Sequence, residues 1–172
     1  NSKELFNDLL QYRYKNGGLE GMSFGNLLIA TLAKVTGSFE LAVREVSEIL
    51  NIRGKVLPST LQDTHICAEL EDGTILKEEH NIRGLNKAPI KRVFLDPDNV
   101  QPVQEALDAI NEADVILLGP VSLFTSVVTN LLVLGIPEAI KKSNAKKTYI
   151  MNIVTQPGQT DGFKAKDHID TI

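Results

Sequence analysis

Hydroxyl and amide side chains gather around a break between two apolar runs in the segment 114–133, DVILLGPVSLFTSVVTNLLV. The first run, Val115 to Leu118, is interrupted by Gly119-Pro120, and a second run begins at Val127. We interpret the first run as a buried strand and the second as a helix whose N-terminus carries capping Ser and Thr residues. Such a corner binds anions, because free N–H groups and the helix dipole point at the space above the strand. The ligand-binding residues expected here are Gly119, Ser122, Thr125, Ser126 and Asn130.

A second polar loop follows a second apolar run. Residues 148–154, TYIMNIV, predict another buried strand, which ends in the polar turn 155–160, TQPGQT. The helical segment between the two strands makes them a βαβ unit, so they should be parallel and adjacent. Their loops then open on the same edge of the sheet, where ligands bind in open α/β folds. We expect Thr155 and Gln156 to line that edge, and His168 to follow closely enough to reach a ligand.

Uncharged polar loops suit a phosphate, a ribose or a uracil-like edge better than acid–base chemistry. The alternative is that these side chains only satisfy turns and helix caps. The sequence holds no carboxylate pair at readable spacing, no Walker loop, no dinucleotide fingerprint and no Gly-x-Ser-x-Gly elbow. His65, His80 and His168 show no metal-ligand spacing, and His65 and His80 are expected at the surface. We therefore predict no catalytic residue and no metal ligand.

Composition indicates an ordinary globular protein. Of 172 residues, 42% are hydrophobic and 23% are charged, which suits one domain with a substantial core. A net charge of −4 gives no general attraction to nucleic acid or anionic membranes, so any phosphate site must be local. The single cysteine, Cys67, excludes an internal disulfide and fits a buried residue in a reducing compartment. No apolar run has the length of a membrane span, and we expect a cytoplasmic protein.

The other elements must position these loops. Helices are predicted over 3–14, from 24 to about 34, and over 39–50, 103–111, 127–136 and 137–142, with Ser23 and Ser38 as N-caps and Gly37 between them. Strands are predicted over 64–70, 74–77 and 90–95, with a hairpin turn at 71–73. We expect a single α/β domain over 1–172, with a mainly parallel sheet and an antiparallel β-meander in its middle third. The apolar helix 127–136 fits either the core or the interface of a homodimer.

Four motifs occur in order along nearly the whole chain. They are Gly21-x-Ser23-Phe24-Gly25-Asn26-Leu27-Leu28, Gly119-Pro120-x-Ser122-Leu123-Phe124-Thr125-Ser126, Asn130-Leu131-Leu132-Val133 and Asn152-Ile153-x-Thr155-Gln156-Pro157-Gly158-x-Thr160. Together they resemble the bacterial gluconeogenesis factor family, which shares its fold with 2-phospho-L-lactate transferase. The resemblance implies a Rossmann-like three-layer sandwich with a nucleotide or nucleotide-sugar across the strand ends. It also adds Ser23 and Asn26, from the first capped helix, to the expected site.

The bacterial branch of the resembled family binds uridine-diphosphate sugars and is associated with gluconeogenic growth and cell shape. The transferase branch takes a phospholactate group from a guanosine-diphosphate carrier and uses magnesium. The segment 122–126 resembles the bacterial branch. This chain departs from the family at Met22, Val121, Phe124, Thr129 and Gln159, where His, Gly, Tyr, Pro and Glu are usual. Similar proteins begin with a glycine-rich strand and loop, so we expect a fragment that lacks this region and part of the C-terminus.

Three hypotheses follow. The first, which we favour, is a cytoplasmic regulatory protein that binds a nucleotide or uridine-diphosphate sugar and affects carbon metabolism and cell shape. The second is a transferase of phosphorus-containing groups that uses a nucleoside-diphosphate-linked donor and magnesium. The third is a degenerate relative that binds nothing, because Val121 does not readily adopt the positive φ that a glycine permits.

Overall fold

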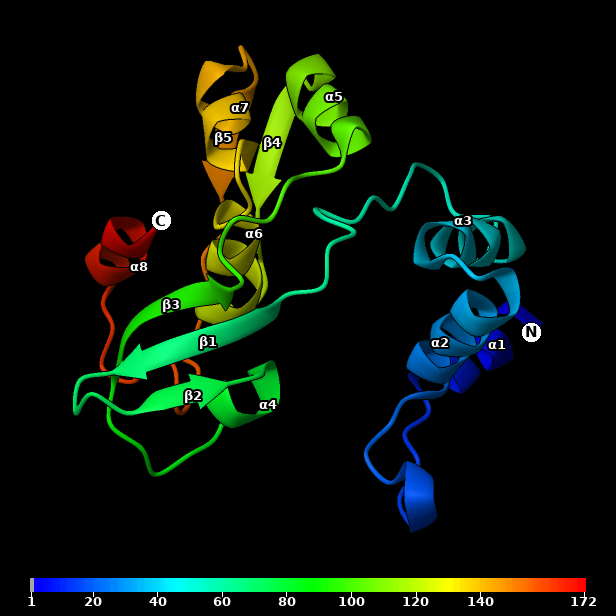
Figure 1. Cartoon of the computed structure of the whole chain (residues 1–172), viewed down its shortest axis with the longest axis horizontal. Coiled ribbons are helices and arrows are strands. Elements are labelled where there is room, and N and C mark those ends of the chain that lie inside the picture. The colour runs from blue at the N-terminus through cyan, green and yellow to red at the C-terminus, as the bar shows by residue number, and fades with distance from the viewer. Residues whose placement is uncertain (1) are drawn as a thin grey trace. The chain divides into compact units, whose positions relative to one another are not determined.

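The computed structural model describes residues 2–172 and comprises two compact units, Asn1–Pro58 and Ser59–Ile172. The first unit is helical and the second contains both sheets (Figure 1). The α/β class is therefore confirmed, and the single domain expected over 1–172 stays a prediction.

The N-terminal unit consists of three α-helices and a short 3-10 helix. Helix α1 spans Ser2–Gln11, η1 spans Gly17–Leu19, α2 spans Phe24–Thr36 and α3 spans Phe39–Ile49. Both predicted caps are confirmed, because Ser23 Oγ accepts from Asn26 N and Ser38 Oγ accepts from Leu41 N, each at 3.2 Å. Helix α1 ends earlier than predicted, because Tyr14 N donates to the Met22 carbonyl instead of continuing the helix.

Three antiparallel strands form one sheet of the second unit. Strand β1 spans His65–Leu70, β2 spans Ile75–Lys77 and β3 spans Ile90–Asp96, in the order β2-β1-β3. The hairpin turn between β1 and β2 is confirmed, but the meander order is wrong, because β3 pairs with β1 and not with β2. Strand β1 buries Cys67, Ala68 and Leu70, whereas β2 buries no side chain. Because β1 pairs with β2 on one edge and with β3 on the other, the backbone N–H and C=O groups of the most buried strand are hydrogen-bonded.

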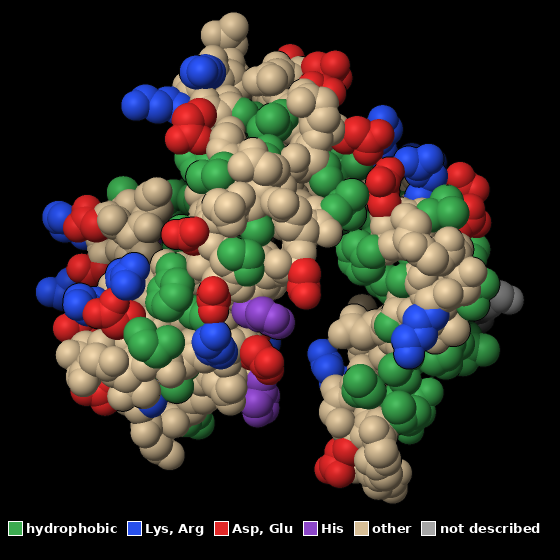
Figure 2. Space-filling view, viewed as in Figure 1, with side chains coloured by type: hydrophobic (Ala, Val, Ile, Leu, Met, Phe, Trp, Pro, Cys, Tyr) green, Lys and Arg blue, Asp and Glu red, His purple; other side chains and the backbone are tan. Residues whose placement is uncertain are grey.

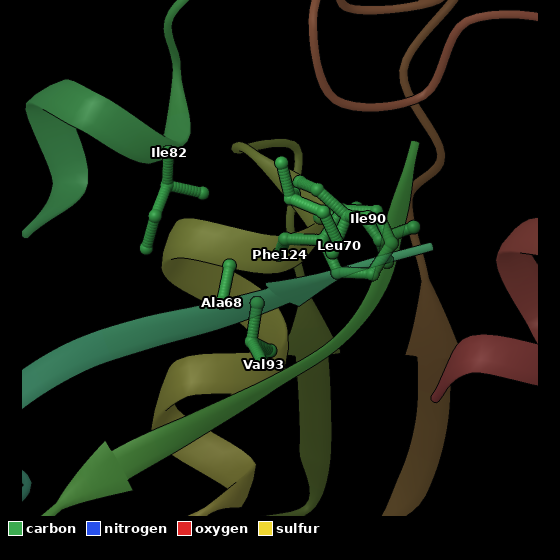
Figure 3. Close-up of a cluster of buried hydrophobic side chains, with 7 residues drawn as sticks. Ala68, Leu70, Ile82, Ile90, Val93 and Phe124 are labelled. Atoms are coloured by element: carbon green, nitrogen blue, oxygen red, sulfur yellow. The ribbon is translucent and has the colours of Figure 1, made fainter. Parts of the chain in front are cut away.

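A buried hydrophobic cluster joins this sheet to the helix that begins at Leu123, between the two strands of the second sheet. Ala68, Leu70, Ile90 and Val93 of the sheet pack with Ile82, Leu123 and Phe124. Ile82 ends the short helix α4, Glu79–Ile82, which follows β2. Figure 3 shows the labelled side chains converging between the strands and the helix that carries Phe124. Burying each large side chain contributes about 1.5–3 kcal/mol, so the cluster fixes the start of that helix against the sheet.

The second sheet is a parallel pair of short strands. Strand β4 spans Val115–Leu118 and β5 spans Lys146–Tyr149, and their predicted parallel pairing is confirmed. The predicted strand 148–154 is wrong in its bounds, because β4 ends at Leu118 and β5 has no partner beyond Ile150, whose N–H donates to Leu118 O at 2.8 Å. Full burial is also wrong, since Val115 and Leu117 are 52% and 58% exposed.

Helices flank the parallel pair. Helix α5 spans Gln104–Glu112, α7 spans Ile136–Lys142 and α8 spans Ala165–Thr171. Leu95, Val100, Val133 and Ile136 form a second buried cluster beside α5 and α7. The apolar residues of the segment 127–136 thus lie largely in the core of this unit, and a homodimer stays a prediction. Three strands are antiparallel and two are parallel in the described chain, so a mainly parallel sheet is not confirmed, and the Rossmann-like layering stays a prediction.

Charged side chains of both signs are interspersed on the visible face of the second unit (Figure 2). Glu69 pairs with Lys91 and Arg92, each at 2.6 Å, and these hydrogen bonds lower the pKa of the Glu69 carboxyl. Cys67 is buried as predicted, and its burial raises the pKa of its thiol.

In the described residues no single helix has the length and apolar character to cross a membrane, although the bent pair 123–131 and 136–142 meets both criteria together.

Candidate ligand site at the ends of the parallel strands

The loop after β4 turns at Gly119-Pro120, whose peptide bond is cis. Gly119 has a φ of +83°, and a Cβ built on it would lie 2.6 Å from the Ile150 carbonyl oxygen. Side chains avoid both this backbone conformation and so short a contact, so the position requires glycine. Gly119 thereby allows the loops after β4 and β5 to approach each other.

The helix after this loop begins at Leu123 and not at Val127 as predicted. Its first part, η2, is a π-helix over Leu123–Val128, and it continues into α6, Thr129–Leu131. Val127 N donates to Ser122 O at 3.0 Å, the five-residue spacing of a π-turn. Thr129 Oγ1 donates to Phe124 O at 2.9 Å. Ser122 occupies the N-cap position, but the expected capping is wrong, because its side chain makes no cap hydrogen bond.

Gln156 connects the two predicted loops. Its Nε2 donates to Ser122 Oγ at 3.0 Å, and its Oε1 accepts from Leu123 N at 3.3 Å. Its own backbone N–H donates to Thr160 Oγ1 at 2.8 Å, and Thr160 is fully buried. The loops after β4 and β5 therefore meet at one edge of the sheet, as the βαβ pattern predicts. The first amide of the helix is already satisfied by Gln156, so it is not free to bind an anion.

A cavity of about 640 Å³ opens beside these loops. This size lies within the range of small-molecule sites. It is lined mainly by the chain that follows β5, with one residue from the β2–β3 connection and one from the β4 loop. The lining residues are Arg83, Pro120, Ile150, Met151, Asn152, Ile153, Val154, Thr155, Gln156, Pro157 and Gln159.

The β2–β3 connection is held against the second loop by a close backbone contact. A Cβ on Gly158 would lie 2.5 Å from the Gly84 carbonyl oxygen, and Gly158 has a φ of +76°. Lys87 Nζ donates to Gly158 O, and burial lowers the pKa of the Lys87 ammonium. This contact brings Arg83 to the cavity, where it is the only cationic side chain among the described lining residues.

Two carbonyl oxygens near the cavity are buried without a hydrogen-bond partner in the described chain. They are Asn152 Oδ1 and Gln159 Oε1, and both residues line the cavity. Gln159 is only 6% exposed. An unsatisfied buried polar group costs about 1–3 kcal/mol and is uncommon in folded proteins, so both oxygens call for a donor from elsewhere.

The structure brings two of the predicted residues, Thr155 and Gln156, into the cavity lining. The Thr155 side chain is exposed, whereas the side-chain amide of Gln156 already bonds within the protein. Gly119 and Ser122 adjoin the cavity through their contacts with Ile150 and Gln156. These placements bring both loops to one cavity.

Three predicted residues on the helix lie outside that lining. Thr125 is buried, with Oγ1 at 3.4 Å from Glu79 Oε1. Asn130 Nδ2 donates to Ser126 O at 2.8 Å, and Asn130 Oδ1 accepts from Ser59 Oγ. The Ser126 hydroxyl makes no hydrogen bond with the described residues, so it is the freest of the three. Ligand contact by these residues stays a prediction.

His168 lies in a packed aromatic cluster. It is 4% exposed in α8, and its Nδ1 is 3.2 Å from the Tyr149 hydroxyl. Phe163 packs edge-on against its ring, and burial raises the pKa of Tyr149. His168 is outside the cavity lining, and its contact with a ligand stays a prediction.

Two predicted site residues, Ser23 and Asn26, and two histidines, His65 and His80, remain to be described. Ser23 and Asn26 belong to the N-terminal unit, where together they cap α2, and their ligand contact stays a prediction. His65 and His80 are exposed, as predicted.

Sequence reasoning missed Arg83, Asn152 and Gln159. Asn152 was assigned to a strand that ends before it, and Arg83 reaches the site only through the contact of Gly84 with Gly158. The available signal was their position, because Asn152 lies three residues before the TQPGQT turn and Gln159 lies within it. No group of three or more His, Cys, Asp or Glu residues within 2–172 is arranged to hold a metal ion.

These features define the class of protein: an α/β protein whose candidate ligand site lies at the carboxyl ends of parallel strands. The family profile described as 2-phospho-L-lactate transferase CofD matches residues 1–172, and the chain belongs to this family. The resemblance drawn from the four sequence motifs is thereby confirmed.

Named relatives agree with this assignment. The gluconeogenesis factor of Halalkalibacterium halodurans is 51% identical over 169 residues, which cover 98% of this chain and 52% of that protein. The gluconeogenesis factor of Bacillus subtilis is 46% identical over 169 residues, covering 98% and 53%. A crystal structure of a UPF0052 family member from Bacillus halodurans matches with a TM-score of 0.88 and 51% identity, covering 98% of this chain and 54% of that one. The chain thus spans about half the length of these relatives.

Proposed function

We propose that this chain is part of a cytoplasmic regulatory protein that binds a nucleotide or nucleotide-sugar, with a uridine-diphosphate sugar as the first candidate. The observation that carries the proposal is the meeting of the two strand-end loops, through Gln156 and Ser122, beside a cavity of about 640 Å³. Similarity to proteins named gluconeogenesis factors supports a role in carbon metabolism, and a role in cell shape forms part of the same proposal.

The lining divides the cavity into parts with different chemistry. Arg83 supplies a positive charge, its side chain is 60% exposed, and its ion pair with Glu79 is long, at 3.4 Å. A guanidinium so placed can turn to a diphosphate, which it binds through paired N–H groups. Thr155 offers a hydroxyl to a phosphate or ribose oxygen. Because the described residues lack a cluster of acidic ligands, magnesium would be held chiefly by the phosphates of the nucleotide.

Calorimetric titration of the full-length protein with uridine-diphosphate-N-acetylglucosamine, UDP and GDP tests this proposal. We expect saturable binding of the uridine ligands, weakened about tenfold by Arg83→Gln through loss of a charge-assisted contact. The matched control is Arg92→Gln, because Arg92 pairs with Glu69 outside the cavity lining. Ligand at 100 times its dissociation constant should also stabilise the protein by about 2.7 kcal/mol. Absence of saturable binding by every nucleotide would refute the proposal and favour a degenerate relative.

The family match favours a transferase as the second candidate function. A turnover assay with a guanosine-diphosphate-linked phospholactate donor, a deazaflavin acceptor and magnesium tests it. Formation of the phospholactyl product, together with preference for GDP over UDP, would replace the regulatory proposal. No product at high protein concentration, with UDP preferred, would exclude the transferase.

A further inference from the structure

We propose that Asn152 and Gln159 form a nucleobase subsite that reads a ring N–H beside a ring carbonyl. This inference rests on the proposed nucleotide binding and adds the part of the ligand that the cavity recognises. Its basis is the pair of buried oxygens, Asn152 Oδ1 and Gln159 Oε1, which lack partners in the described chain and lie in residues lining one cavity.

The two oxygens require hydrogen-bond donors and not an anion. A carboxamide oxygen only accepts hydrogen bonds. Phosphate oxygens at neutral pH are also mainly acceptors, so the two groups repel each other. Gln159 is only 6% exposed, so bulk water is a poor substitute for a fixed donor. The phosphates of the ligand therefore lie at the Arg83 side, and a donor-bearing group lies at the Gln159 side.

The apolar part of the lining favours a flat ring over a sugar as the donor-bearing group. Ile150, Met151 and Val154 line the same cavity and offer no hydrogen bonds from their side chains. The face of a nucleobase packs against such side chains without losing hydrogen bonds, whereas the hydroxyls of a sugar would lose theirs.

The carboxamide group narrows the class of base. Its oxygen accepts a ring N–H, and its NH2 group donates to the carbonyl beside that N–H. Uracil and guanine satisfy both groups when the carboxamide oxygen faces the ring nitrogen. Cytosine and adenine satisfy a carboxamide only when its oxygen faces their exocyclic amine and its NH2 group faces the ring nitrogen. The proposed orientation, with the oxygen toward the ring nitrogen, therefore predicts tighter binding of UDP than of CDP, and equal affinity for the two would overturn it.

The experiment measures affinity by calorimetry for UDP, CDP and UDP methylated at the ring nitrogen N3, using the full-length protein. If GDP binds more tightly than UDP, GDP and its N1-methylated form take their place. The variants are Gln159→Met, which removes the acceptor at similar length, and Gln104→Met as control, because Gln104 is an exposed helical residue outside the cavity. We expect methylation to weaken binding to the wild type and to the control by about tenfold or more.

In Gln159→Met, affinity for UDP should fall about tenfold, and the penalty for methylation should shrink below about threefold, because the contact it blocks is already gone. The melting temperature of the unliganded variant should equal or exceed that of the wild type, because an unsatisfied buried oxygen is removed. A purely structural role for Gln159 predicts a lower melting temperature instead. The melting temperature therefore shows whether a loss of binding comes from misfolding, and Asn152→Leu, which removes the other unpartnered oxygen, provides a second variant for the same comparison.

The outcomes separate this inference from the proposed function. Tight binding of UDP with an equal methylation penalty in wild type and Gln159→Met overturns the base subsite and leaves the proposed function intact. Uridine-diphosphate-N-acetylglucosamine is titrated alongside UDP, and if Gln159→Met weakens binding of this sugar nucleotide but not of UDP, the oxygens contact the sugar and the base subsite is overturned. Absence of binding by every nucleotide overturns both.

Discussion

Replacing Gly119 with alanine tests whether the two strand-end loops approach as closely as the structure shows. The new Cβ would lie 2.6 Å from Ile150 O, and the backbone would have to keep a φ of +83°. The left-handed conformation costs a non-glycine residue roughly 1–2 kcal/mol. The steric overlap adds about 1–3 kcal/mol, the usual cost of overpacking, because the obstructing atom belongs to the backbone. We therefore expect Gly119→Ala to lower the free energy of unfolding by about 2–5 kcal/mol.

Gly73→Ala provides the matched control. Gly73 lies in the same unit and has a φ of +84°, but no atom lies within 4 Å of a Cβ built on it. It should therefore show only the conformational cost, and the difference between the two variants isolates the steric contact at Ile150. Urea unfolding followed by far-ultraviolet circular dichroism suits this chain, which has no tryptophan.

The expected difference between the two variants is about 1–3 kcal/mol, or roughly 2–12 °C in melting temperature for a domain of this size. Gly119→Ala should also weaken nucleotide binding, because relief of the overlap moves Ile150, which lines the cavity. Equal destabilisation by the two substitutions would show that the loops are farther apart, and the reasoning about the cavity would then fail.

Three further predictions concern packing, capping and acid stability. Leu123→Ala should cost about 2–5 kcal/mol in urea unfolding, since Leu123 is fully buried; a cost below 1 kcal/mol would contradict the packed cluster. Ser38→Ala should reduce the stability of the N-terminal unit by about 1 kcal/mol through loss of the α3 cap, measured as amide exchange in α3, with no change expected in β1. Hydrogen bonds from Lys91 and Arg92 hold the pKa of Glu69 below its usual 4.5, so this stabilisation is present above pH 4.5 and is lost as pH falls through the lowered pKa. Glu69→Gln should therefore lose less stability than the wild type between pH 7 and pH 3, and equal losses would argue against the pairing.

Features set by neighbouring residues were predicted well from the sequence. Ser23 and Ser38 cap the helices that their positions indicate, and Gly37 ends the first of these helices with a φ of +70°. The hairpin turn at 71–73 and the parallel pairing of β4 with β5 also follow from short-range patterns. Each of these features is decided within a few residues or by one well-understood connection, so little tertiary information is needed.

Features that depend on distant partners were predicted poorly. The run 148–154 is apolar enough for a strand, but strand β5 ends at Tyr149 because its partner has already turned at Gly119. The order β2-β1-β3 likewise depends on which strand is buried on both sides, which local alternation does not reveal. The early helix start at Leu123 follows from its burial against β1 and β3 in the sheet.

The candidate site was predicted in part for the same reason. Thr155 and Gln156 follow β5 directly, so the βαβ rule places them at the sheet edge. Arg83 comes from the connection between β2 and β3, the two outer strands of the antiparallel sheet, and only the contact of Gly84 with Gly158 brings it to the cavity. No spacing in the sequence links residue 83 to residue 158.

The chain after β5 reverses the usual distribution of polar and apolar groups. Ile153 is fully exposed and Val154 is 73% exposed, while the side-chain oxygens of Asn152 and Gln159 are buried without partners among the described residues. Both features lower the stability of the free protein. The apolar side chains stay exposed to water, and the buried oxygens lose their hydrogen bonds to water. Residues that break the rules of stable packing concentrate where a protein binds something, since the ligand supplies the missing contacts. A nucleobase in this cavity would donate to the buried oxygens and cover apolar side chains, so the same loop should become more protected from amide exchange when UDP binds.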